Sequence, residues 1–529
     1  MDTIVGRGNH GAIVTLIERS TNMLFMRKIK LFYTKVRILQ ICFVILHLLV
    51  DSTIAFLVLI KLLFSHSFLV FCTFVADMEK DNSNFTFLTE GGIHKVVVKM
   101  AVPTIISMLV TSLYNIADTY FVGQINTQAT AAVGIVFSLM FFIQACGFFF
   151  GHGSGNYISR ELGTRRHDNA TRMASTGFFY SFFFGILIMI GGLVFIRPLS
   201  LLLGSTPTIL SYTEKYLEII LLGTPFLTSS LTLNNQMRLQ GNASYAMYGI
   251  VAGAILNVAF DPLLIFGLNL GITGAAIATL IGQITSFLIL FFMARHGKNI
   301  GIYFRNFSPS WSAFKEIFYG GSPSLSRQGL ACFATMSLNI AAGAYGDAAI
   351  AAMSIVSRIS LLILAIVIGL GQGFQPLCGF CYGAKLYDRL EEAYKFTVKT
   401  GTIFLIFCSL IGCIFSGSLI QIFRNDEQVI AIGIVALRWQ LCTYALNAFI
   451  IASNMLLQTC RKPLRANFLA AARQGLFFIP LIYILPQFLG LYGVEICQAV
   501  SDVLSFIATV PIIIYTFKEF NLEKKNIKV

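Results

Sequence analysis

The feature that most constrains this chain is an alternation of long apolar runs and short polar breaks that begins at Val96. Each run is close to the ~20 residues that a helix needs to cross a bilayer. Of the 529 residues, 56% are hydrophobic and only 12% are charged, which is about half the charge of an average soluble domain. The pattern therefore predicts an all-α polytopic membrane protein and excludes a soluble one.

Twelve transmembrane helices account for the apolar runs. They are expected at residues 95–121, 129–153, 172–196, 210–231, 244–266, 272–294, 314–342, 347–374, 394–416, 430–456, 465–487 and 491–517. Prolines inside these runs, such as Pro103 and Pro323, are tolerated because neighbouring helices satisfy the freed backbone groups.

The chain also repeats itself. One nearly constant shift along the chain superimposes Pro103 on Pro323, Gly123 on Gly343, Gly163 on Gly383 and Pro262 on Pro480. We therefore expect two homologous six-helix lobes, an N-terminal one at 78–305 and a C-terminal one at 306–529. An even number of spans gives both lobes the same orientation, as in transporters whose halves rock about a central site.

Residues 1–77 form a hydrophobic extension that does not follow the repeat. An apolar run from Ile38 to Ala76 is too long for a signal peptide. It predicts one or two extra spans, unless translation begins at Met78, where a polar start precedes the first repeat.

Basic residues fall on alternate sides of the predicted helices. One side holds loops rich in Lys and Arg, including Arg160, Arg165, Arg238, Lys385 and Arg461, whereas the other side holds only Arg197, Lys215 and Arg424. The positive-inside rule then places both ends of the twelve-helix body in the cytoplasm, in a plasma (inner) membrane. This distribution explains the net charge of +14 without a nucleic-acid partner.

Two acids within the N-terminal spans are the sharpest functional candidates. Asp118 lies in the first predicted helix and Asp261 in the fifth, with Asn257 one turn earlier and Thr279 on the sixth helix. Low dielectric disfavours a charged carboxyl group, so such a cluster can exchange a proton, and its oxygens could instead hold Na⁺. The alternatives are a helix-packing hydrogen bond for Asp118 and a cap beside Pro262 for Asp261.

The C-terminal half offers different ionisable groups. Arg327, Arg358, Glu495 and Asp502 fall within its spans. Arg358 is a candidate internal partner for a carboxylate. The two acids of the last helix are expected near the membrane interface in a structural role, so functional acidic chemistry is assigned to the N-terminal half.

Two other motifs do not indicate a functional site. The glycines of Gly151-x-Gly153-x-Gly155 follow no strand, and their repetition at Gly371-x-Gly373 predicts a helix-end turn. Cys378-x-x-Cys381 has no second cysteine pair and reads as apolar packing. We find no combination of nucleophile, base and metal ligands, so the chain is not expected to be an enzyme.

Four segments carry a further signal: Tyr114-Asn-Ile-Ala-Asp118-Thr-Tyr-Phe-Val-Gly123, Gly151-His-Gly-Ser-Gly-Asn-Tyr-Ile-Ser-Arg-Glu-Leu-Gly163, Leu256-Asn257-Val-Ala-Phe-Asp261-Pro262 and the stretch from Gly371 to Lys385. Together they resemble the multidrug and toxic compound extrusion (MATE) family. The similarity extends from residue 95 to about 515 and is greatest to bacterial multidrug exporters. Cys381 departs from the Asn expected there.

The resemblance implies a V-shaped pair of lobes that exports amphipathic or cationic drugs in exchange for H⁺ or Na⁺ by alternating access. Asp118, Asn257, Asp261 and Thr279 match the family's N-lobe cation cluster, with a possible Na⁺ at the first three, and Asn235 is a weaker match. It implies no cofactor beyond the ion, and a monomer whose partners are drug-like molecules and lipid. The alternative is a flippase for a lipid-linked sugar, for which few basic residues fall within the spans.

Overall fold

The structure, a computed structural model, describes residues 84–296 and 299–528, so the expectations for residues 1–77 lie outside it. Every regular element in the described ranges is a helix. The N-lobe contains α3 (Asn84–Glu90), α4 (Ile93–Gly123), α5 (Thr127–Gly163), α6 (His167–Val194), α7 (Ile196–Leu202), α8 (Leu210–Leu239), α9 (Ala243–Pro262), a π-helical segment (Leu263–Gly267) and α10 (Gly271–Met293).

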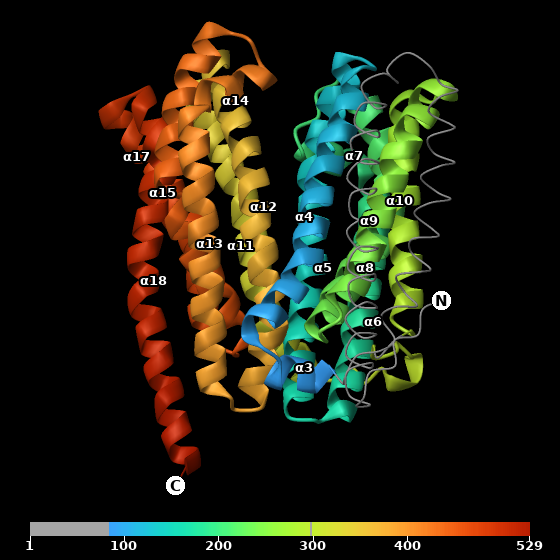
Figure 1. Ribbon diagram of the computed structural model, residues 1–529. Helices are drawn as coiled ribbons and strands as arrows, with labels where there is room; N and C mark the ends of the chain where they lie inside the picture. The colour runs from blue at the N-terminus through green and yellow to red at the C-terminus, as the bar shows by residue number, and fades with distance from the viewer. Residues whose placement is uncertain (1–83, 297–298, 529) are drawn as a thin grey trace, which may run out of the picture. The chain divides into compact units, whose positions relative to one another are not determined.

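A linker with a short 3-10 turn (Phe304–Asn306) leads to the C-lobe. This lobe contains α11 (Trp311–Gly343), α12 (Asp347–Gly383), α13 (Tyr387–Ile414), α14 (Ser416–Phe423), α15 (Glu427–Thr459), α16 (Pro463–Ala471), a second π-helical segment (Ala472–Phe477), α17 (Phe478–Leu489) and α18 (Leu491–Lys528). Figure 1 shows α4 to α10 gathered on one side and α11 to α18 on the other, with α4 and α12 facing each other.

Within the described residues, eleven helical segments are long and apolar enough to cross a membrane. Helix α11 completes the expected set, since it spans 33 residues. It is less apolar because it carries Lys315, Glu316 and Arg327 among several serines. The all-helical polytopic architecture predicted from the sequence is confirmed.

The two lobes end their second helices in the same way. Arg165 and Lys385, which occupy equivalent positions in the two repeats, adopt left-handed φ angles of 60° and 58°. After α5, the Arg166 N–H donates to the Glu161 carbonyl at 2.9 Å, and after α12 the Leu386 N–H donates to the Cys381 carbonyl at 2.8 Å. Both are Schellman ends, which satisfy carbonyls that the last helical turn leaves free.

The expected turn at Gly151-x-Gly153-x-Gly155 is wrong. These glycines lie inside α5, which continues to Gly163, and Gly371 and Gly373 likewise lie inside α12. A Cβ at Gly153 would sit 2.3 Å from the Ile317 carbonyl oxygen of α11. The repeated glycines therefore mark positions where two helices approach backbone to backbone.

The lobes meet along this contact, which we call the seam: α5 packs on α11 and α12, and α4 packs on α12. The equivalent residues Gly163 and Gly383 face each other, because a Cβ on either would lie 3.1 Å from the other's Cα. Beside them, Arg160 of α5 pairs with Glu316 of α11 at 3.1 Å. Arg160 also donates to the Thr459 carbonyl at 2.9 Å. The seam is therefore closed at the end of the molecule that carries the basic loops.

The glycine contact yields a first prediction. Gly153→Ala should lower the melting temperature of the purified protein in detergent, because its Cβ must displace the α11 backbone, at a cost of about 1–3 kcal/mol. Gly134→Ala on the same helix is the matched control, since no atom lies within 4 Å of its added Cβ. Equal melting temperatures for the two variants would show that the seam yields without cost.

Candidate functional site

The two predicted acids come together between neighbouring helices of the N-lobe. Asp118 lies five residues before the end of α4, Asp261 lies one residue before the end of α9, and the two helices pack against each other. Asp118 is 8% exposed and Asp261 is fully buried. Their carboxyl groups are close enough to interact electrostatically.

The carboxyl groups of these two acids lack hydrogen-bond donors. Oδ1 of Asp118 and both carboxyl oxygens of Asp261 are buried, and no described residue donates a hydrogen bond to them. A buried carboxylate without a donor is costly, and a bound proton or a cation removes that cost. Because Asp261 accepts no hydrogen bond from the backbone around Pro262, the alternative that it caps a helix break finds no support here.

Asn257 and Thr279 meet beside the acids, as predicted. Asn257 Nδ2 donates to Thr279 Oγ1 at 3.2 Å, which leaves Asn257 Oδ1 buried without a donor. Glycines allow this contact, since a Cβ at Gly253 of α9 would lie 2.6 Å from the carbonyl oxygen of Gly282 on α10. Close approach of α9 and α10 therefore orients one more free oxygen near the acids.

Directly after Asp261 the backbone becomes π-helical, over Leu263–Gly267. Such segments interrupt regular helices and are frequent at functional sites. Pro262 has no N–H to donate, which favours a change of hydrogen-bond register there. Asp261 is thus placed where the helix geometry changes.

A cavity that is partly open lies in the N-lobe beside this cluster. It is formed by α4, α5, α8, α9 and α10, and Asn257 and Thr279 are part of its wall. The two acids are not in the wall. Tyr114, which is, lies within electrostatic reach of both.

Tyr114 and Gln283 are two of the wall residues that the sequence did not predict. Tyr114 lies one helical turn before Asp118, and Gln283 one turn after Thr279, so the i,i+4 spacing could have found both. The Gln283 side-chain oxygen is also buried without a donor.

Asn235 and Arg358, the weaker candidates, are not part of this cluster. Asn235 Oδ1 accepts from Arg238 at 2.7 Å. The side chain of Arg358 is exposed, and no carboxylate of the described residues pairs with it, so its expected role as an internal partner of a carboxylate stays a prediction. Arg238 was expected in a loop, but it is 1% exposed near the end of α8 and contacts the C-lobe.

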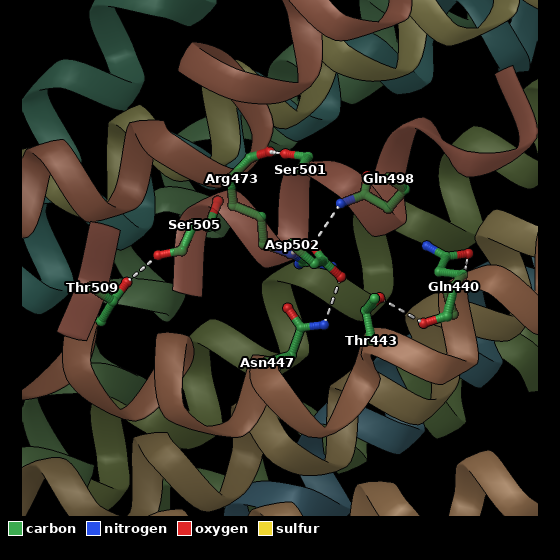
Figure 2. Close-up of polar contacts among 10 residues, drawn as sticks. Gln440, Thr443, Asn447, Arg473, Gln498, Ser501, Asp502, Ser505 and Thr509 are labelled. Carbon is green, nitrogen blue, oxygen red and sulfur yellow. Dashed lines mark hydrogen bonds and ion pairs between the residues drawn. The ribbon is translucent and has the colours of Figure 1, made fainter. Parts of the chain in front are cut away.

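The C-lobe holds a polar cluster of a different kind (Figure 2). Asp502 of α18 is fully buried, and Arg473 of the second π-helical segment pairs with its Oδ1 at 2.7 Å. Gln498 donates to the same oxygen at 2.9 Å, and Asn447 of α15 donates to Oδ2 at 2.8 Å. These contacts agree with the structural role expected for Asp502, because its charge is neutralised inside the lobe.

Arg473 and Arg238 show that the sequence underestimates the basic residues within spans. Arg473 lies within the predicted span 465–487 and Arg238 in a predicted loop, and neither was expected to be a buried cation. The signal was present for Arg473, since a lone Arg inside an apolar helix requires a partner.

Two repeated six-helix lobes, with unpaired acids buried in one of them, define a class of polytopic membrane transporter. The MatE family model matches residues 103–263 and 323–484, which is more than half of the chain. The chain belongs to the MatE family. The two matched ranges begin at Pro103 and Pro323, the prolines that the internal repeat superimposes.

Curated relatives and solved structures agree with this assignment. Multidrug export protein MepA of Staphylococcus haemolyticus (strain JCSC1435) is 27% identical over 417 residues, covering 78% of this chain and 92% of the relative. MepA of Staphylococcus aureus (strain NCTC 8325 / PS 47) is 26% identical over 444 residues, covering 83% and 97%.

Among solved structures, the outward-facing conformation of a multidrug resistance MATE family transporter of the MOP superfamily has a TM-score of 0.79 at 26% identity. A MOP superfamily transporter from Pyrococcus furiosus Vc1 (DSM3638) has a TM-score of 0.78 at 26% identity. Each match covers 84% of this chain and all of the other.

The C-lobe pair yields a second prediction. Asp502→Asn should lower the melting temperature strongly, because it leaves Arg473 buried without a negative partner, at a cost of about 3–5 kcal/mol. Adding Arg473→Gln should recover part of the loss, since it removes the unpaired charge. A double variant destabilised by the full sum of the two single changes would show that the two side chains act independently.

Proposed function

We propose that this protein is a secondary antiporter that exports amphipathic or cationic drugs in exchange for H⁺ or Na⁺ bound at Asp118 and Asp261. The observation that carries the proposal is the set of three carboxyl oxygens that are buried without a donor. A proton converts one carboxyl group into a donor, and Na⁺ is coordinated by carboxylate and amide oxygens such as Asn257 Oδ1. Either ion satisfies the same cluster.

The contrast with the C-lobe supports this choice of site. Asp502 accepts three hydrogen bonds, one of them from its ion-pair partner Arg473, so it gains little from binding a cation. Asp118 and Asp261 have no such partners among the described residues. The neighbouring cavity, with Asn257 and Thr279 in its wall, gives drug and ion a common region, and the names of the MepA relatives support multidrug export.

The energy available is sufficient for export. One positive charge that enters through a membrane potential of ~100 mV releases about 2.3 kcal/mol, enough to hold an approximately 50-fold drug gradient. The ion's own concentration gradient adds to this.

The cycle follows alternating access in a plasma (inner) membrane, with the basic end in the cytoplasm. The closed seam of the described residues, held there by contacts such as Asn156 with Thr459 at 3.1 Å, then corresponds to a state closed toward the cytoplasm. The chain works as a monomer without a cofactor other than the coupling ion, and its partners are the drug and the lipid.

A third prediction tests the coupling site. Asp118→Asn and Asp261→Asn should each reduce ion-driven efflux of a cationic dye from proteoliposomes by tenfold or more, because an amide cannot take up the coupling proton and carries no charge for Na⁺. H⁺ and Na⁺ gradients are imposed separately, so the same assay identifies the ion.

Asp347→Asn is the matched control, because Asp347 is an exposed acid at the start of α12. It should export dye as the unmodified protein does. Neither variant should have a lower melting temperature than the unmodified protein, because the buried carboxyl oxygens they replace accept no hydrogen bond. Undiminished ion-driven efflux by the two variants would refute the coupling role.

A fourth prediction tests the orientation. In a cysteine-free background, a cysteine at the exposed Thr206 should react with a membrane-impermeant maleimide on intact cells, and one at the exposed Arg166 should react only after lysis. The reverse pattern would place the basic end outside.

A further inference from the structure

The seam contains a group of cations that the proposed coupling site does not use. Arg238 of α8 reaches across the seam to α12, where it donates to the side-chain oxygens of Gln372 and Gln375. Its remaining partners are Asn235 Oδ1 at 2.7 Å and His152 Nε2 at 3.0 Å. Arg238 is 1% exposed and Gln372 is 2% exposed, so this charge is enclosed between the lobes.

No carboxylate of the described residues pairs with this charge, because each partner named above is a neutral amide or imidazole. Arg327 of α11 lies within electrostatic reach of Arg238 and donates to Asn454 Oδ1 at 3.2 Å, again a neutral group. Two guanidinium groups therefore lie within electrostatic reach of each other, and no carboxylate of the described residues pairs with either. Charges inside a membrane protein are expensive and generally serve a function.

The hydrogen bonds determine which ring nitrogen of His152 carries the proton. A guanidinium group only donates, so His152 Nε2 accepts from Arg238, and its proton must be on Nδ1. That Nδ1 lies 3.0 Å from Ser324 Oγ of α11, which also accepts from Gln458 Nε2 at 2.8 Å. The imidazole is thus neutral and occupied on both nitrogens, and it cannot accept another proton without losing Arg238.

The position of this group along the helices matters. Asp118 lies 25 residues from the first residue of α4, or ~37 Å from the basic end at the helical rise. His152 lies 11 residues before the last residue of α5, or ~16 Å from the same end. The cations therefore lie between the acids and the basic loops.

We propose that Arg238, together with Arg327 and the neutral His152, is an electrostatic barrier that prevents the coupling cation from leaking through the closed seam. A fixed positive charge repels H⁺ and Na⁺ in a narrow path, as charged groups do in channels that exclude cations. A guanidinium group also keeps its proton, so it cannot relay one. The proposal rests on the proposed antiport, in which a cation bound at Asp118 and Asp261 must not cross without a drug.

The test measures ion leak without a drug. The full chain is reconstituted in proteoliposomes, a potassium diffusion potential is imposed, and entry of H⁺ or Na⁺ is followed with an internal dye. Arg238→Gln should raise cation leak by about tenfold, as expected for removal of a unit charge roughly 10 Å from the path at an effective dielectric constant of about 20. Arg238→Lys, which keeps the charge, should stay within about twofold of the unmodified protein.

Two controls separate charge from packing. Arg172→Gln removes an exposed basic residue of α6 and should not change the leak. Chloride leak, measured in the same vesicles, should not rise in Arg238→Gln, because the loss of a positive charge does not help an anion. Should Arg238→Gln not fold, Arg327→Gln should give a smaller rise in cation leak with the same ion selectivity.

Three results would overturn the barrier: a cation leak of Arg238→Gln equal to that of the unmodified protein, an equal rise in Arg238→Lys, or a parallel rise in chloride leak. The first shows no barrier, and the other two show a seam that has simply loosened. Failure of the antiport is distinct, since it appears as absence of ion-driven dye efflux by the unmodified protein. The leak assay contains no drug, so its result does not depend on dye efflux.

Discussion

The structure depends on a contact between backbones. At the seam, glycines remove the side chains that would otherwise separate α5 from α11 and α4 from α12. The contact follows the internal repeat: Gly153 meets Ile317 on α11, and Gly373, its equivalent in the second half, meets Ala101 on α4. Because lipid supplies no hydrophobic drive between helices, such close van der Waals packing is what holds membrane lobes together.

Around this symmetric contact the polar chemistry is not symmetric. The C-lobe pairs its buried acid Asp502 with Arg473 and two amide donors. The N-lobe leaves oxygens of Asp118 and Asp261 without any donor. The buried acid of one lobe is thus satisfied by its neighbours, whereas the other lobe leaves buried carboxyl oxygens free. Duplication supplied the scaffold, and divergence of a few side chains made the buried polar groups of the two halves differ.

The seam combines charged and neutral polar contacts. Arginines make most of them, but two of the deep ones join neutral groups, His152 with Ser324 at 3.0 Å and Asn156 with Thr459 at 3.1 Å. Exchanging bonds of this kind for bonds to water costs little net free energy. The ion pair of Arg160 with Glu316 lies at the end near the basic loops, where incoming water can solvate both charges. A seam closed by buried salt bridges would be far harder to separate.

The sequence by itself determined the helices, the repeat and the membrane, because the length of apolar runs and the recurrence of residues at a constant shift can be read along the chain. It also identified Asp118, Asp261, Asn257 and Thr279, since ionisable or polar residues inside an apolar run are conspicuous. The turn expected at Gly153 was wrong. A single sequence does not distinguish a glycine that ends a helix from a glycine that allows close approach of a neighbouring helix.

Only the tertiary structure decided which polar groups find partners. Asp502 and Asp261 are both acids in apolar helices, and nothing local distinguishes them. One meets Arg473 from another helix and the other meets no donor. Arg238, which the chain's local pattern placed in a loop, is enclosed because α12 of the other lobe covers it. Partnership of a buried charge depends on contacts between residues far apart in sequence, and packing alone creates those contacts.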